Sequence, residues 1–218
     1  MKRRELLNLI DEGEGTGIEF KQRFSEYEKI AKEMIAFANS KGGVIIFGIN
    51  DDKSVCGVAS EKGEAELIKE TAEKYCEPPV DYKIEYFDVD NKELVIVIIA
   101  ESPVKPHRLQ DYLKEIDLNH ANVYVRVNDK SVLASKEMIK ILQARTVEQS
   151  LIKYQVGKNE KIVFEYLDAN ENITVKDLGR LANISDRRAS RTLIKLVRAN
   201  LLNIHTKDNG EDYFTYAG

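Results

Sequence analysis

The chain has 218 residues, of which 43% are hydrophobic and 32% are charged, and its formal net charge at pH 7 is −4. This is the composition of a globular protein with one large or two ordinary domains, and it excludes a disordered chain. No apolar run approaches the roughly 18–20 residues of a membrane span, and two cysteines make neither a disulfide framework nor a zinc cluster, so we expect a cytoplasmic protein without a membrane partner.

The first 21 residues predict a short helix and a strand. The segment 4–10 can form a short helix with Leu6, Leu7 and Ile10 on its inward side. An acidic loop with three glycines follows over residues 11–17. Residues 16–21 then alternate apolar and charged side chains toward their end, which is typical of a half-buried strand.

The segment 35–57 is the one around which the first half of the chain is organised. A capping-box signature, Ser25 followed by Glu28, predicts the start of the amphipathic helix that precedes it. Asn39 and a glycine pair end that helix, because glycine adopts backbone angles that leave a helix without a Cβ clash. The apolar run 44–49 reads as a strand buried on both faces, and we expect residues 55–58 to return beside it as a hairpin.

The rest of the first half predicts further strands and helices around one long loop. The expected elements are a helix over 63–76, strands over 80–88, 93–100 and 122–127, and a helix that opens at Ser135. The polar segment 102–121 between them is long for a compact domain, and such loops are usually functional or mobile.

The sign of the charge changes along the chain. From residue 151 onward there are 11 Lys and Arg against 9 Asp and Glu, a net of +2, which leaves −6 on the first 150 residues. Such a shift indicates two modules with different partners. We therefore expect a first domain over residues 1–147, a linker over residues 148–158, and a second domain over residues 159–218.

The second domain predicts three helices and a hairpin. Its expected elements are helices over 160–167, 175–181 and 185–199, and strands over 201–207 and 211–216. Thr174 and Ser185 are typical N-caps of the second and third helices, and Asp208-Asn209-Gly210 is a strong hairpin turn. This order of elements predicts a winged helix-turn-helix.

The third helix of that domain carries a basic face. At 100° per residue, its cationic side chains fall on one side and its apolar side chains on the other. The cations are Arg187, Arg188, Arg191, Lys195 and Arg198. Such a face suits the DNA major groove, where arginine reads guanine and its neighbours contact phosphates. The alternative is an ordinary solvated face, or a winged helix that contacts protein.

Several motifs of the first half resemble the Schlafen/AlbA-type DNA-binding domain family. They occur in the family's order over roughly residues 1–145. They are Glu-Gly-Thr-Gly-Ile-Glu-Phe-Lys from residue 14, Ala-Phe-Ala-Asn-Ser-Lys-Gly-Gly from residue 36, Phe-Gly-Ile-Asn-Asp from residue 47 and Tyr-Val-Arg-Val from residue 124. Bacterial members are often fused to a C-terminal winged helix and described as transcriptional regulators.

The resemblance also raises a nucleotide-binding alternative, because some members are described as ATP-binding proteins. The chain has no Gly-x-x-x-x-Gly-Lys-Ser/Thr motif. Its glycine pair, Gly42-Gly43, precedes a strand, whereas a phosphate-binding loop follows a strand and opens a helix. A phosphate cradle at this pair is therefore disfavoured.

The resemblance implies a ribonuclease alternative as well. In Schlafen-type ribonucleases, acidic residues at the positions of Glu14, Glu19 and Asp51 carry metal-dependent RNA cleavage, in which clustered carboxylates hold Mg²⁺ or Mn²⁺. Lys21 lies on the same strand face as Glu19 and is a candidate phosphate contact. The structural alternative is that Glu14 and Asp51 are ordinary loop acids and that Glu19 pairs with Lys21.

Together these patterns predict an α+β fold, with a mixed sheet and flanking helices of Schlafen/AlbA type followed by a winged helix-turn-helix. The predicted function is nucleic-acid binding, as a DNA-binding transcriptional regulator whose partner is duplex DNA, with RNA as the alternative. No cofactor is expected unless the first domain is a nuclease. Helix-turn-helix regulators are commonly symmetric, so we expect a homodimer.

Overall fold

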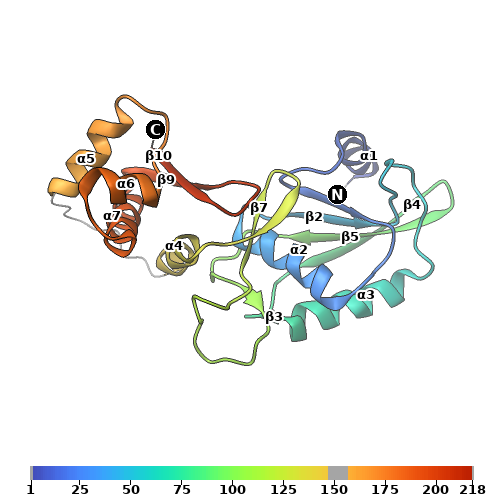
Figure 1. The fold of residues 1–218 in the computed structure, drawn as a ribbon. Coiled ribbons are helices and arrows are strands. Elements are labelled where there is room, and N and C mark those ends of the chain that lie inside the picture. The colour runs from blue at the N-terminus through green and yellow to red at the C-terminus, as the bar shows by residue number, and fades with distance from the viewer. Residues whose placement is uncertain (1, 147–156, 218) are drawn as a thin grey trace. The chain divides into compact units, whose positions relative to one another are not determined.

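Figure 1 shows the computed structural model of the chain, which describes residues 2–146 and 157–217. Contacts divide the chain into two compact units, Met1–Leu133 and Ala134–Gly218. The linker expected over residues 148–158 lies, up to residue 156, outside the described residues. None of the described helices combines the length and the apolarity needed to cross a membrane.

The first unit is built on a four-stranded mixed sheet. The strands are β1 (Ile18–Lys21), β2 (Gly43–Phe47), β5 (Lys92–Ile99) and β4 (Lys83–Val89), hydrogen-bonded in that order. β1 runs parallel to β2, and the other two pairings are antiparallel. The predicted mixed sheet is therefore confirmed.

Helices cover both faces of this sheet (Figure 1). α2 (Tyr27–Asn39) and α3 (Glu61–Glu70) pack on one face, and α1 (Arg3–Glu12) packs on the other. Within β2, Ile45 and Phe47 face α2, whereas Ile46 faces α1, and all three are fully buried. The apolar run thus forms a strand buried on both faces, as predicted.

Two short antiparallel strand pairs complete the first unit. β3 (Cys76–Glu77) pairs with β6 (Arg108–Leu109), and β7 (Tyr124–Val127) pairs with β8 (Lys130–Leu133), both antiparallel. Asn39, the last residue of α2, joins these segments because its amide donates to the carbonyl oxygens of His107 and Tyr124 and accepts from the His107 N–H. The strand β8 was not predicted.

Three sequence predictions for this unit need correction. α2 begins at Tyr27 with Glu26 as its N-cap and no side-chain cap, so Ser25 does not cap it. Residues 55–58 form no strand and contribute one isolated bridge, from Ile49 to Val55, because the chain leaves β2 through a glycine turn. The helix expected over 63–76 ends as an α-helix at residue 70 and continues as a π-helical turn, Thr71–Tyr75.

The described residues of the second unit form four helices and a two-stranded sheet. The elements are α4 (Lys136–Thr146), α5 (Lys158–Leu167), α6 (Val175–Ala182), α7 (Asp186–Arg198), β9 (Leu202–Thr206) and β10 (Asp212–Tyr216). The two strands pair antiparallel. The core lies between the helices and the sheet and includes Val163, Leu193 and Phe214. α4, which precedes the expected linker, contributes Ile141 to this core, and its Glu137 accepts a hydrogen bond from Ser190 of α7.

Candidate functional site

The acidic residues singled out in the first unit lie in three different environments. Glu19 is buried in the middle of β1. Glu14 is exposed in the preceding loop, and its carboxylate accepts a hydrogen bond from the Phe20 N–H at 2.9 Å. Asp51 is exposed in the turn after β2. Glu14 therefore closes the loop back onto β1, and Asp51 takes no part in that contact.

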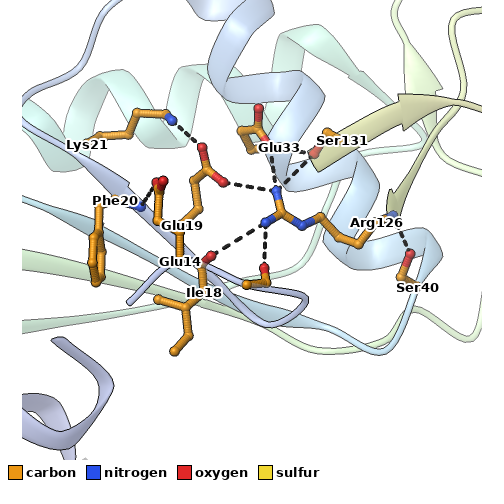
Figure 2. A network of polar contacts seen from close by, with 10 residues as sticks. Glu14, Ile18, Glu19, Phe20, Lys21, Glu33, Ser40, Arg126 and Ser131 are labelled. Carbon is orange, nitrogen blue, oxygen red and sulfur yellow. Dashed lines mark hydrogen bonds and ion pairs between the residues drawn. The ribbon is translucent and has the colours of Figure 1, made fainter. Parts of the chain in front are cut away.

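The side chain of Arg126, on β7, is buried and lies between Glu19 and Glu33 (Figure 2). Its guanidinium donates to Glu19 Oε2 at 2.9 Å and to Glu33 Oε2 at 3.0 Å. It also donates to the Gly15 carbonyl oxygen at 2.6 Å. The exposed fractions of the Arg126, Glu19 and Glu33 side chains are 2%, 9% and 11%. The arginine thus ties β1, α2 and the acidic loop together in a site shielded from water.

One further cation and two serine hydroxyl groups complete this network. Lys21 forms an ion pair with Glu19, as the structural alternative from the sequence expected. Ser131 of β8 donates a hydrogen bond to Glu33, and Ser40 Oγ accepts the Arg126 backbone N–H at 2.8 Å. Two carboxylates are matched by two cations, and buried charges are stable only when they are paired in this way.

This arrangement does not fit a metal centre. Throughout residues 2–146 and 157–217, no group of three or more His, Cys, Asp or Glu side chains is placed to hold a metal ion. The Glu19 carboxylate, which a divalent cation would need, already accepts from a guanidinium and an ammonium group. The structure therefore does not assemble Glu14, Glu19 and Asp51 into the metal site that the resemblance implied. Lys21 is committed to Glu19 and is not displayed as a phosphate contact.

Two members of the network, Glu33 and Arg126, were not among the predicted site residues. Glu33 carried a local signal, because it lies at helical spacing between the buried Ile30 and Phe37, on the apolar face of the helix. A charged residue on such a face is rarely buried unless it is paired. Arg126 lies in the Tyr-Val-Arg-Val motif of the family resemblance, but that motif gave no sign of its ion-pair partners. The arginine lies 107 residues from Glu19 in sequence, and only the tertiary fold brings the two together.

The basic face predicted in the second unit is present on α7. Arg187, Arg188, Arg191 and Lys195 are exposed, and within the described part of the chain none of the four has an ion-pair partner. Arg198 is half-buried and has interactions within the protein, so it differs from the other four. The opposite face of the helix is buried against the core through Ala189, Leu193, Leu196 and Val197.

Local sequence fixes where α7 begins. Ser185 is its N-cap, with its hydroxyl oxygen accepting from the Arg188 N–H. α6 ends at Asn183, which adopts the left-handed conformation that asparagine tolerates better than most residues. Thr174 and Asp177 form a reciprocal capping box at the start of α6. A tight connection therefore joins two well-capped helices and holds the N-terminal end of α7 at the surface.

Comparisons with known proteins bear mainly on the first unit. The Schlafen, AlbA_2 family matches residues 14–135. A protein of Ureaplasma parvum named as an uncharacterised ATP-binding protein is 27% identical over 176 residues, which cover 72% of this chain and 48% of that protein. The chain thus spans about half the length of this curated relative.

Two solved structures are also similar. The DIP2311 protein of Corynebacterium diphtheriae has a TM-score of 0.47 at 13% identity, covering 93% of this chain and 34% of its own. The N-terminal domain of a RecG-related protein from Nitrosomonas europaea has a TM-score of 0.41 at 22% identity, covering 56% of this chain and 86% of its own. Both scores are below 0.5, so neither supports a further statement. The family match, in contrast, spans more than half of the residues, and the chain belongs to the Schlafen, AlbA_2 family.

Proposed function

We propose that this protein is a DNA-binding transcriptional regulator whose second unit is a winged helix-turn-helix. In this proposal α7 enters the major groove of duplex DNA, with Arg187, Arg188 and Arg191 nearest the bases. The hairpin of β9 and β10 is the wing. Because operators with two half-sites match proteins with two-fold symmetry, the proposed binding form is a homodimer.

The observation that carries the proposal is the display of four cations on one helix face. Arg187, Arg188, Arg191 and Lys195 are all exposed, and no described carboxylate neutralises them. A solvated structural helix more often carries mixed charges that pair with one another. Four unpaired cations backed by a buried apolar face are suited to a dense row of phosphates and to guanine edges.

The family adds coarser support. Membership in the Schlafen, AlbA_2 family, together with the DNA-binding theme implied by the resemblance, agrees with a nucleic-acid-related function. The relative named as ATP-binding raises the nucleotide alternative again. We do not propose it, because Gly42 and Gly43 lead into β2 from the end of a helix, the reverse of a phosphate-binding loop. The ribonuclease is not proposed either, because Glu19 is engaged by Arg126 and Lys21.

Charge reversal on α7 tests the proposal. The full chain is titrated into a fluorescently labelled duplex, in parallel with the double variant Arg188→Glu/Arg191→Glu. We expect the variant to lose at least about 30-fold in affinity, since each of the two arginine contacts contributes about 1–3 kcal/mol. The matched control is Lys161→Glu/Lys176→Glu, which reverses two exposed cations outside the basic face. Equal binding by the α7 variant and the wild type would refute the assignment of α7.

A further inference from the structure

A pocket of about 450 Å³ lies in the second unit between the start of α5 and the basic face of α7. Three of its lining side chains, Arg188, Arg191 and Lys195, come from α7, and Lys158 and Glu160 come from α5. The lining therefore holds four cations and one carboxylate. A pocket with this excess of positive charge favours an anionic occupant and disfavours an apolar one.

The backbone at the α5 side of the pocket has the same polarity. α5 begins at Lys158, and its N-cap, Gly157, supplies no side chain to cap the first N–H groups. The unpaired N–H groups of a helix start carry a partial positive charge. This charge adds to the field of the four cations, which by themselves make the pocket a site for an anion.

The pocket overlaps the part of α7 proposed to read bases at Arg188 and Arg191, and it extends beyond that part to Lys195. Lys195 lies eight residues beyond Arg187, which is about 12 Å along a helix. Arg187 lies outside the pocket lining, whereas Lys195 of α7 and Lys158 of α5 both belong to it. Cations supplied by two helices are better suited to a fixed phosphate than to a base edge, which a single side chain reaches.

We propose that this pocket binds one phosphodiester group of the DNA backbone and so sets the register of α7 in the groove. The inference rests on the proposed function, and it adds α5, through Lys158, to the DNA-binding surface. It also assigns different roles to the two ends of α7. Substitutions of Lys158 or Lys195 weaken binding to all sequences equally, whereas substitutions of Arg187 change the preference among sequences.

Glu160 supplies a prediction of opposite sign. Its carboxylate lines the pocket, so it repels a bound phosphate. Glu160→Gln keeps the size of the side chain and removes the charge, and it replaces one acceptor oxygen by an amide donor. We therefore expect this substitution to tighten binding, while Lys158→Gln and Lys195→Gln weaken it. Simple loss of folded structure cannot produce both signs.

The experiment measures the affinity of the full chain for two duplexes of unrelated sequence between 50 and 200 mM salt. Each lost phosphate contact makes the negative slope of log affinity against log salt shallower by about 0.9. The affinity ratio of wild type to Lys158→Gln or Lys195→Gln should therefore shrink about 3.5-fold across this range, equally for both duplexes. Lys161→Gln, which removes the same charge from an exposed position of α5 outside the pocket, is the matched control.

The outcomes separate this inference from the proposed function. If the wild type binds neither duplex, the proposed function fails and the inference fails with it. If the wild type binds, but both pocket variants keep its salt slope, only the inference is overturned. Because ATP offers the same phosphate chemistry, it is titrated into the full chain as well. Saturable ATP binding that Lys158→Gln abolishes would reassign the pocket to a free nucleotide and overturn the DNA-backbone assignment.

Discussion

The substitution Arg126→Met tests whether the first unit depends on its buried charge network. Methionine is similar in length, so the packing over the Phe37 ring, 4.7 Å from the guanidinium carbon, is largely kept while the charge is removed. The variant leaves Glu19 with Lys21 alone and Glu33 with Ser131 alone. Removing one partner from a buried ion pair costs about 3–5 kcal/mol, and the low exposure of all three side chains means that solvent does little to reduce this cost.

This free energy converts to a large thermal shift. With about 2.1 cal/mol/K of unfolding entropy per residue, a unit of this size loses roughly 10–18 °C in Tm. Thermal and urea unfolding of the full chain measure the change, and hydrogen exchange in peptides from residues 14–47 assigns it to the first unit.

A second substitution makes the test specific to charge. In the Arg126→Met background, Glu33→Gln removes a stranded carboxylate and should recover about 1 kcal/mol or more, whereas in the wild type it breaks an ion pair and destabilises. The reasoning is refuted if Arg126→Met costs less than about 1 kcal/mol, or if Glu33→Gln has the same effect in both backgrounds.

Three further predictions concern the first unit. Gly42 has a φ of +78°, and a Cβ at this position would lie 2.5 Å from the Ile99 carbonyl oxygen. Gly42→Ala should therefore lower the free energy of unfolding by more than about 1 kcal/mol, measured as a lower urea midpoint. An unchanged midpoint would contradict this prediction. Burial lowers the pKa of His107 below 6.5, so its neutral form is favoured in the folded state and its contribution to stability is lost as pH falls below about 6.5. Urea midpoints between pH 7.5 and 5 should fall less steeply for His107→Gln than for the wild type, and parallel curves would disprove this assignment. Burial raises the pKa of the Cys76 thiol to about 12, whereas Cys56 is exposed. A thiol reagent at pH 8 should therefore label Cys56 and leave Cys76 unmodified until the protein unfolds. Rapid labelling of both cysteines would show that Cys76 is accessible.

The sequence predicted those features that depend on neighbours along the chain. The strand 44–49 was recognisable because a short, continuous β-branched run is typical of a strand that is buried on both faces. The basic and apolar faces of α7 followed from helical periodicity alone, and the structure buries the apolar face and exposes four of the five cations.

The features that failed depend on partners distant in sequence. The alternation in β1 placed Lys21 beside Glu19, and the structure shows that ion pair. It gave no indication that Glu19 also accepts a hydrogen bond from Arg126 on β7. The metal site at Glu14, Glu19 and Asp51 was implied by the family resemblance, and a motif match does not reveal which carboxylates the fold already neutralises. The Ser25 signature failed for a related reason. Tertiary packing moved the start of α2 to Tyr27, where the helix begins without a side-chain cap.

The salt dependence of duplex binding tests the central claim most directly. The full chain is titrated into one duplex at several salt concentrations between 50 and 200 mM, and log affinity is plotted against log salt. We predict a steep negative slope of about −3 or beyond, since four exposed cations of α7 contact phosphates or bases. The same plot for Arg188→Glu/Arg191→Glu should be clearly shallower. A wild-type affinity that does not change with salt, or no duplex binding at 50 mM, would contradict the account.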